Sequence, residues 1–514
     1  MRKWLPLIAV CLGTFMLLID VTIVNVALPD MAVDLKTSFG SLQWVVDAYA
    51  LTLAALVLGT GSIADQVGHR RAYIGGLALF AVSSLVCGIS PNSGVLITAR
   101  AVQGVGAAAM FATTFALLNS SYSGRDRGTA YGLWGAVSGA SAAVGPIIGG
   151  LLTEGISWRW IFFVNLPVSV VAIVMCAVVL TDAHPPVRQR VDVPGMVVFT
   201  AAAAAATYGL IRANEHGWSS TGAWGMLVAA VVLGAVFVVI EARTAQPMLD
   251  LGLMRNRAFV GTLVAGLLLT FAAFASFTYT SIWMQSVLGL SPIQAGLTGL
   301  PLSLASFVTS AALGRVLHKA APGPLIGGGL LLIGLGGVVG GLLVHGSASW
   351  PALLPGFFVI GIGVGMATPT LSSTAMSAVP VQRGGMAAGA VNTARQLGFA
   401  FGIAALGSVF ATRAQSSLSS HHVPAAGRVA QAVAGGQSPV LLRSVPASAR
   451  AALDDALHAA AVSGVQMTLY VSAIAGLVAG VIVLALVRRD SRPAQEEQAS
   501  HAATDGATTP EPVA

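Results

Sequence analysis

Long apolar stretches separated by short polar segments dominate this chain. Fourteen stretches have about 18 residues or more with few interior charges, the length that a helix needs to cross a bilayer. The pattern therefore predicts fourteen membrane-spanning helices. We place them at 5–28, 42–63, 72–90, 94–118, 130–152, 161–181, 194–213, 222–241, 259–282, 293–314, 323–345, 351–373, 386–411 and 465–487.

The spacing of these spans divides the chain into three parts. It predicts an N-terminal six-helix bundle over 1–181, a linker with two inserted helices over 182–258, and a C-terminal six-helix bundle over 259–489. We expect a long outer loop at 413–465, with a short surface helix at 448–460. The Pro-, Ala-, Glu- and Thr-rich segment 490–514 is predicted to be a disordered cytoplasmic tail.

Composition supports an all-α polytopic membrane protein. Apolar residues make up 55% of the 514 residues and charged residues 9%, and the mean hydropathy is +0.82. Most Lys and Arg side chains fall in loops on one side if both termini are cytoplasmic, as the positive-inside rule requires. The pI of 9.7 is thus explained by topology and gives no support to nucleic-acid binding.

Three lysines against 23 arginines, in an Ala- and Gly-rich chain, indicate a GC-rich bacterial genome. The basic, apolar start of the chain imitates a signal peptide, but no small-residue cleavage site leads into a soluble domain, so we interpret it as the first span. Cys11, Cys87 and Cys176 fall inside spans, which implies no disulfide framework.

The first and the fourth spans each carry a charge in their interior. Asp20 lies in the first span and Arg100 in the fourth. With a rise of 1.5 Å per residue, Asp20 lies roughly 12 Å and Arg100 roughly 9 Å below the outer boundary, so the two can meet. Asp47 lies roughly 6 to 8 Å deep in the second span. A buried charge is costly, so Asp20 is predicted to be a functional site with Arg100 as its partner.

A static ion pair that joins two helices is the alternative for Asp20 and Arg100. Static buried pairs are poor stabilisers after desolvation, which favours a switching role. Moving Arg100 toward or away from Asp20 would release or bind a proton. Asp47 has two readings, a solvated helix start and a coupling residue.

The order of motifs along the chain resembles the fourteen-span drug:proton antiporter branch of the major facilitator superfamily. The matching segments are LIDVTIVNVALP at 18–29, GSIADQVGHRR at 61–71, LITARAVQGVGAA at 96–108, GPIIGG at 145–150, WRWIFFVNLP at 158–167, SPIQAGLTGLP at 291–301 and NTARQLGFAFG at 392–402. They cover nearly the whole chain. The resemblance implies two six-helix bundles related by a pseudo-twofold axis that rock about a central site.

The resemblance also implies roles for particular residues. A cytoplasmic gate would comprise Gly61, Asp65, Gly68, Arg70 and Arg71. Asp65 would pair with loop or neighbouring-span cations in one conformation and release them in the other; the alternative is an ordinary positive-inside loop. The antiporter motif would comprise Gly145, Pro146, Gly149 and Gly150, although Ser141 stands where a glycine is usual, and plain close packing is the alternative for each glycine.

Six polar or aromatic residues are candidates to line a substrate cavity. Asn392, Arg395 and Gln396 share one helix face, where interhelical hydrogen bonding is an equal alternative to substrate contact. Trp134 is better explained by packing. The full set is Asn25, Gln103, Trp134, Asn392, Arg395 and Gln396.

Acidic residues are scarce in the second half of the chain. From Asn256 through Arg489 they are Asp454 and Asp455, both in the predicted outer loop, and Glu241 is expected to be solvated at a helix end. Spans 9 to 14 thus offer no membrane carboxylate to a cation. We therefore expect the transported substrates to be neutral, anionic or at most monovalent cationic lipophiles.

Missing motifs exclude several classes of protein. No intramembrane histidine site, HExxH helix or phosphate loop occurs, so neither a metal nor ATP hydrolysis is indicated. We predict a proton-coupled antiporter in the bacterial inner membrane, with both termini cytoplasmic, that exports drug-like molecules. It would act as a monomer with no cofactor besides the proton. A proton-coupled nutrient symporter and, more remotely, an intramembrane aspartyl protease using Asp20 and Asp47 are the alternatives.

Overall fold

The computed structural model describes residues 2–37, 39–181, 192–216, 218–245, 247–314, 320–379 and 383–487. Helices make up most of this part of the chain, and it contains no strand. Thirteen of its helices or joined helices are long and apolar enough to cross a membrane. The predicted fifth span is not among these thirteen, but it lies within a helix of 32 residues that is rich in Gly and Ala. The segment 182–191 and the tail 490–514 lie outside the described residues.

The N-terminal half of the chain contributes six predicted spans. Its elements are η1 (Arg2–Trp4), α1 (Leu5–Asp34), α2 (Phe39–Val67), α3 (His69–Gly88), α4 (Ser93–Ser121), α5 (Gly124–Gly155), α6 (Trp160–Phe163) and α7 (Asn165–Val179). Helices α3 and α4, α2 and α4, and α1 and α5 are the main packing pairs. Gly145 shows how close this packing is, because a Cβ there would collide with Thr22 of α1.

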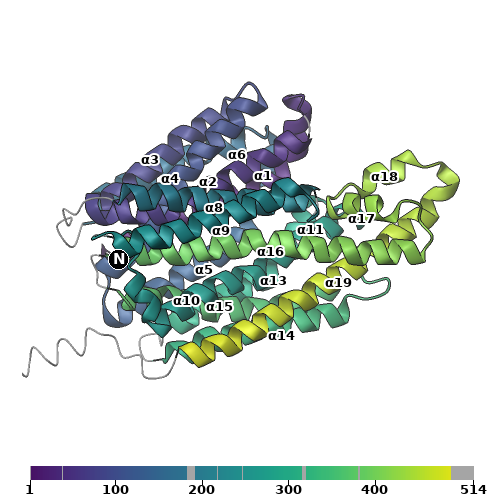
Figure 1. The fold of residues 1–514 in the computed structure, drawn as a ribbon. Coiled ribbons are helices and arrows are strands. Elements are labelled where there is room, and N and C mark those ends of the chain that lie inside the picture. The colour runs from purple at the N-terminus through teal and green to yellow at the C-terminus, as the bar shows by residue number, and fades with distance from the viewer. Residues whose placement is uncertain are drawn as a thin grey trace, which may run out of the picture.

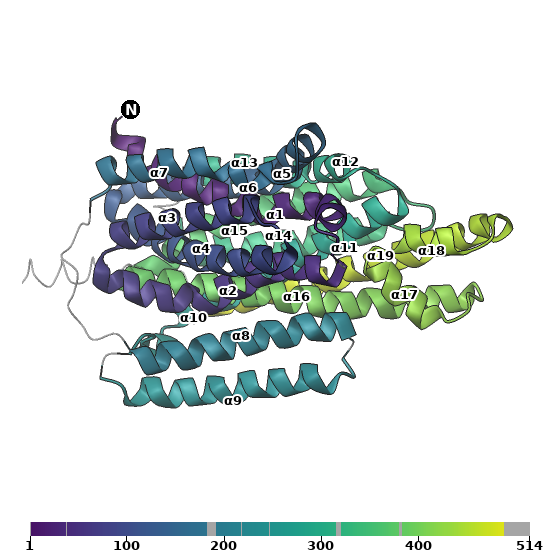
Figure 2. The ribbon, with the colours of Figure 1, turned by 90° about the horizontal axis from the view of Figure 1, so that it is seen from above.

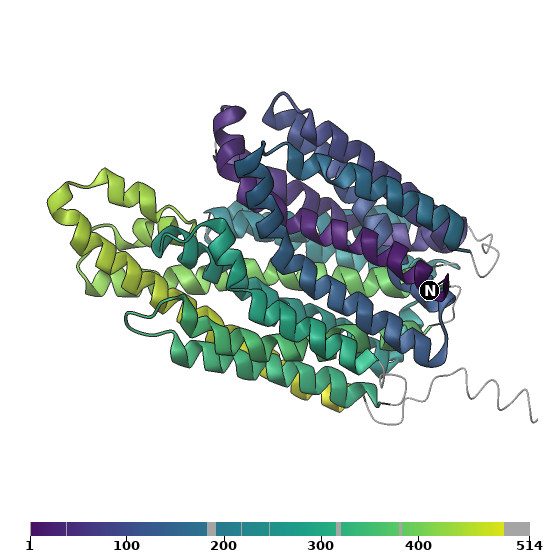
Figure 3. The ribbon, with the colours of Figure 1, turned by 180° about the vertical axis from the view of Figure 1, so that it is seen from behind.

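The C-terminal half begins with a short 3₁₀ helix. Its elements are η2 (Leu251–Arg255), α10 (Arg257–Thr270), η3 (Phe271–Ala275), α11 (Ser276–Ile282), η4 (Trp283–Val287), α12 (Pro292–Leu297), α13 (Leu300–Gly314), α14 (Pro322–Leu343), η5 (Trp350–Leu353), α15 (Leu354–Ser377), α16 (Gly384–Ser420), α17 (Ala426–Ala434), α18 (Ser438–Ser444) and α19 (Ala447–Leu486). The two halves form the two sides of the molecule in Figures 1 and 3. The π-helical segments η3 and η4 interrupt the ninth span, which runs from 257 to 287.

Helices α8 (Val193–His216) and α9 (Thr221–Arg243) form an antiparallel pair at one edge of the molecule. Figure 2 shows α9 outermost, with α8 between it and the other helices. Helix α8 contacts α2 of the first half and α16 of the second half. The inserted pair therefore lies along the boundary between the halves.

The predicted outer loop 413–465 is largely helical. Helix α16 continues to Ser420, and α19 begins at Ala447 and runs without a break to Leu486. The predicted separate surface helix at 448–460 is therefore wrong, since this segment is the first part of α19. No proline occurs within 447–486, so nothing in the sequence stops the last span from extending. With α17 and α18, these helix ends form a projection at the end opposite the N-terminus (Figure 1).

Candidate functional site

An ion pair between Asp20 of α1 and Arg100 of α4 lies in the interior of the first half. Arg100 Nη1 contacts Asp20 Oδ2, and both side chains are fully buried. The prediction that the two charges meet is confirmed by this contact. Because a buried charge without a partner is very costly, each group holds the other in place.

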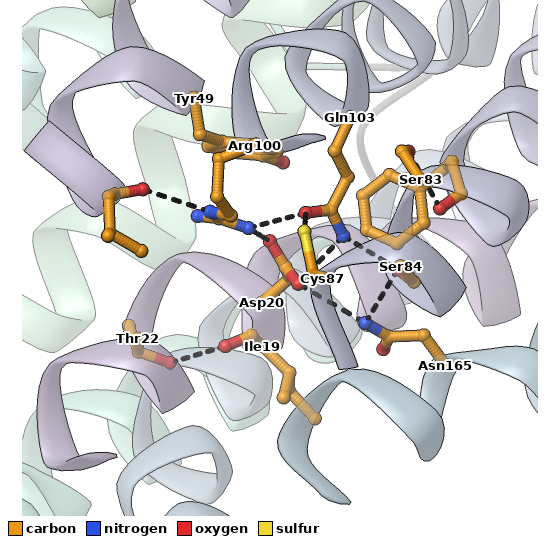
Figure 4. Close-up of polar contacts among 12 residues, drawn as sticks. Ile19, Asp20, Thr22, Tyr49, Ser83, Ser84, Cys87, Arg100, Gln103 and Asn165 are labelled. Atoms are coloured by element: carbon orange, nitrogen blue, oxygen red, sulfur yellow. Dashed lines mark hydrogen bonds and ion pairs between the residues drawn. The ribbon is translucent and has the colours of Figure 1, made fainter. Parts of the chain in front are cut away.

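Two amide side chains complete the shell of Asp20. Its Oδ1 accepts hydrogen bonds from Gln103 Nε2 at 3.1 Å and from Asn165 Nδ2 at 3.2 Å. Both amides also reach Ser84 Oγ on α3, at 2.7 and 3.3 Å. Figure 4 shows these groups converging on Asp20 from α3, α4 and α7. We call Asp20, Ser84, Arg100, Gln103 and Asn165 the buried polar network.

The structure places one of the cavity candidates within this network and adds another residue. Gln103, predicted to line a substrate cavity, is completely buried, because its place one turn after Arg100 turns it toward Asp20. Asn165 was missed. Its signal was present in the segment WRWIFFVNLP, where it is the first residue of α7.

Arg100 makes further contacts with α2. Its Nε donates to the backbone carbonyl of Val45 at 3.0 Å, and its guanidinium lies 4.2 Å from the ring centroid of Tyr49. Among the described residues its Nη2 has no hydrogen-bond partner. The guanidinium is therefore held by a carboxylate, a carbonyl and an aromatic face, and its Nη2 could still donate a hydrogen bond.

Asp47 lies on a different side of α2 from this contact. Val45 and Tyr49 are four residues apart and share a face, whereas Asp47, midway between them, points the opposite way. Trp44, on the same side as Asp47, packs against Tyr208 of α8 with ring centroids 5.7 Å apart. The half-buried Asp47 is thus on the side of α2 that meets the inserted pair, and its role in coupling stays a prediction.

Asp65, near the end of α2, connects the two halves. Its Oδ1 accepts a hydrogen bond from the Gly385 amide at 2.8 Å, and its Oδ2 accepts one from the Met386 amide at 3.0 Å. Its Oδ1 also lies 2.7 Å from His69 Nε2. The carboxylate thus binds the positive end of the α16 dipole, where we had expected cationic side chains.

The other gate residues have different local tasks. A Cβ on Gly61 would collide with the backbone of Gly385, so α2 and α16 touch directly here. Gly68 has φ +98°, a backbone conformation that glycine adopts readily, and precedes α3. Arg70 donates to the carbonyl of Ala177 on α7, and Arg71 is exposed.

The antiporter-motif glycines lie on a continuous α5. The helix runs through 146 without interruption, and the side chain of Pro146 lies outside the described part of the structure. Gly145 faces α1, Gly149 is buried, and a Cβ on Gly150 would meet Ile293 of α12. Helix α5 thus contacts both halves of the chain, since Ser310 of α13 also donates to the carbonyl of Gly132 at 2.8 Å.

The cavity candidates fall into distinct surroundings. Trp134 is buried, donates to Thr14 Oγ1 at 3.1 Å and lines a small pocket within the first half. Asn392 Nδ2 donates across the boundary between the halves to the carbonyl of Phe111 at 3.1 Å. The side chain of Asn25 lies outside the described residues.

Arg395 and Gln396 are half-buried on α16. The Nη1 of Arg395 is buried and has no hydrogen-bond partner among the described residues. The described residues as a whole contain no cluster of three or more His, Cys, Asp or Glu side chains that could hold a metal.

Comparisons with known proteins agree with this architecture. The family model described as Major Facilitator Superfamily matches residues 10–403. Multidrug resistance protein Stp of Mycobacterium tuberculosis (strain CDC 1551 / Oshkosh) is 34% identical over 418 residues, which are 81% of this chain and 78% of Stp. The tetracenomycin C resistance and export protein of Streptomyces glaucescens is 30% identical, over 98% of this chain and 96% of that protein.

A solved structure shares the fold at low sequence identity. The human organic anion transporter MFSD10 (TETRAN) superposes with a TM-score of 0.61 at 14% identity, covering 94% of this chain and 99% of that one. At this identity the match bears on fold alone.

Proposed function

Because the chain belongs to the Major Facilitator Superfamily and is a multi-pass membrane transporter, we propose that it exports lipophilic, drug-like molecules in exchange for protons. The names of its relatives, which are multidrug and antibiotic resistance proteins, support this class of substrate. The proposed location is the bacterial cytoplasmic membrane, with both termini in the cytoplasm. The transporter would work there as a monomer, with the proton as its only coupling ion.

The buried polar network is the observation that carries the proton-coupling part of this proposal. Arg100 stabilises the negative charge of Asp20, and a proton on Asp20 would remove the reason for the pairing. Asp20 and Arg100 lie on different helices, so a shift of α1 against α4 would separate them. Gln103 and Asn165 would remain to hydrogen-bond the protonated carboxyl. Proton binding and helix movement would thus be linked.

Contact between the halves supports an alternating-access cycle. Asp65 joins α2 to the first turn of α16 at the end of the molecule that holds the N-terminus. With a cytoplasmic N-terminus, this contact would close the transporter toward the cytoplasm. Opening would break two charge-assisted hydrogen bonds and separate Gly61 from Gly385. The contact would act as a latch.

The charged side chains of the second half indicate which substrate charge the transporter would prefer. Arg395 has a buried Nη1 without a hydrogen-bond partner in the described part of the chain, and no acidic residue occurs on α10 to α16. We therefore propose that the transporter prefers neutral, anionic or at most monovalent cationic lipophiles. Efflux of matched monovalent and divalent cationic dyes tests this preference. Robust export of the divalent dye, unchanged by Arg395→Gln, would contradict it.

Transport in proteoliposomes tests the main proposal. Wild-type protein should drive uphill dye movement when a pH gradient is imposed, and dye movement should in turn carry protons the opposite way. Asp20→Asn keeps the side-chain shape but removes the titrating charge, so gradient-driven transport should disappear. Glu154→Gln, which changes an exposed acid on α5, is the matched control and should transport normally. Movement of protons and substrate in the same direction would identify a symporter instead.

A further inference from the structure

Two acidic side chains meet where the inserted helix pair opens toward the N-terminal end of the molecule. Asp192 precedes the first residue of α8, and Glu241 lies in the last turn of α9. Only 6% of Asp192 and 3% of Glu241 is exposed to solvent. Glu241 was expected to be solvated at its helix end. That expectation is wrong, because the segment after α9 folds back over its carboxyl group.

Each carboxylate has one oxygen that is bonded and one that is not. Asp192 Oδ1 accepts a hydrogen bond from the Gly195 amide at 2.9 Å, and Glu241 Oε2 accepts one from the Leu249 amide at 3.3 Å. Asp192 Oδ2 and Glu241 Oε1 are buried without a partner among the described residues.

The two unpartnered oxygens point at the same spot. A Cβ built on Gly195 would collide with Asp192 Oδ2 and lie 2.9 Å from Glu241 Oε1. Glycine at 195 therefore leaves open the space in which the two oxygens face each other. A side chain at this position would occupy it.

Two ionised carboxylates cannot face each other in a buried place without a compensating charge. The charged residues on the neighbouring described elements are Asp65, His69, Arg70, Arg71, Arg243, Asp250, Arg255, Arg257 and Arg383. Arg70 donates to the carbonyl of Ala177 on α7, and Arg71 and Arg257 are exposed. Asp250 pairs with Arg383, and Asp65 binds His69 and the start of α16. Arg243 and Arg255 are exposed. Within the described part of the chain, no cation pairs with either carboxylate.

A single shared proton satisfies this geometry. It would turn one carboxylate into a donor, pair both orphan oxygens in one hydrogen bond, and leave one negative charge facing the Gly195 and Leu249 amides. A metal ion fits less well, since the described residues contain no group of three or more His, Cys, Asp or Glu side chains that could hold one, and hard cations take six or more oxygen ligands. We propose that Asp192 and Glu241 form a proton-binding site on the inserted helix pair, separate from Asp20.

A chain of contacts connects this site to the latch. Leu249, which donates to Glu241, is followed by Asp250, and Asp250 forms an ion pair with Arg383 at 2.8 Å. Arg383 directly precedes α16, whose first turn binds Asp65. Loss of the shared proton would make the two carboxylates repel and displace the segment that holds Arg383. The site would thus sense the proton concentration at the same end of the molecule as the latch.

Infrared difference spectroscopy of the full-length protein tests the site without relying on transport. A protonated carboxyl group has a C=O stretching band that shifts in D₂O and that an ionised carboxylate lacks. We expect wild type to show such a band at neutral pH and to lose it as the pH rises. Glu241→Gln and, separately, Asp192→Asn should each abolish it, and the exposed-acid control Glu154→Gln should keep it.

Several results would overturn the proposal. One is a wild-type spectrum without a protonated carboxyl band at neutral pH. Another is a band that survives both Glu241→Gln and Asp192→Asn, since it would then belong to another acid such as Asp20. Asp20→Asn separates the two sites, because it should abolish coupled transport and leave this band unchanged. If it removed the band, the site on the inserted pair would be refuted even though the proposed coupling role of Asp20 stood.

Thermal unfolding provides a second readout. The melting temperature of wild type should fall as the pH rises through the range in which the band disappears. Glu241→Gln supplies a permanent hydrogen-bond donor, so its melting temperature should lack that fall. An identical pH dependence in wild type and Glu241→Gln would contradict the proposal.

Discussion

The carboxylate of Asp65 accepts a hydrogen bond from the backbone amide of Gly385, which is 320 residues away in the sequence. Both residues lie at helix ends, one closing α2 and the other opening α16. The bond joins the halves of the transporter through a side chain on one side and main chain on the other. Any movement that parts the halves at this end must break it.

Asp65→Asn should weaken closure at this end without disturbing the substrate site. A negative charge at a helix N-terminus contributes about 1 kcal/mol, so its loss should lower the closed population several-fold. We expect a slower transport cycle, a near-normal substrate affinity, and a larger defect in Asp65→Ala, which also loses the acceptor atoms. Transport rate and equilibrium binding must be measured separately. Reduced affinity with an unchanged rate would argue against the latch.

Gly385→Ala should hinder closure by steric conflict alone. Its methyl group would collide with the carbonyl of Gly61 and with Asp65 Oδ1. Distances between spin labels at the exposed positions Arg71 and Ser377 should shift toward longer values. Gly75→Ala is the matched control, because a Cβ there meets nothing within 4 Å. An unchanged distance distribution in Gly385→Ala would show that this contact does not limit closure.

Arg100→Lys should fail to replace arginine although it keeps the positive charge. Arg100 uses Nη1 for Asp20 and Gln103 and Nε for the carbonyl of Val45, and one ammonium group cannot span these acceptors. We expect gradient-driven transport to fall at least tenfold, equivalent to about 1.4 kcal/mol. Arg413→Lys, at an exposed position on α16, should behave as wild type. Normal coupling in Arg100→Lys would mean that charge alone is sufficient.

The ion pair between Asp34 and Arg159 should add slightly to the stability of the folded protein, and this contribution should be lost in acid. Hydrogen bonds from Arg159, and then from Trp158, lower the pKa of Asp34 below its ordinary value. A lowered pKa means that the stabilisation is present above the ordinary pKa of about 3.9 and is lost as the pH falls through the lowered value. Both side chains are partly exposed to solvent, which screens the interaction, so the effect should stay below about 1 kcal/mol. Melting temperatures of wild type and Asp34→Asn should therefore differ at neutral pH and converge in acid.

The sequence predicted those features that depend on apolar length and on buried charge. Span lengths located the helices, and the depths of Asp20 and Arg100 predicted their meeting, since a charge in an apolar run needs a partner. The partners of Asp65 could not be predicted in this way. They are main-chain amides, which every residue carries, and only the packing of α2 on α16 brings them close.

The burial of an acidic side chain by a reversal of the chain could not be predicted from the sequence either. Glu241 stands at the end of an apolar run, where solvation is the usual outcome, and its burial depends on how the segment that contains Leu249 folds back over it. Asn165 had no charge to mark it, and its contribution follows from where α7 begins. Both cases depend on tertiary contacts that local hydropathy does not encode.

The length of α16 and α19 has a practical consequence. Helices of 37 and 40 residues extend about 55 and 60 Å, whereas the hydrocarbon core of a bilayer is about 30 Å thick. Together with α17 and α18, their ends form the projection described above, which is continuous with two helices of the second half. An antibody fragment bound to this projection would tilt with that half, so its orientation in single-particle images would report each step of the transport cycle.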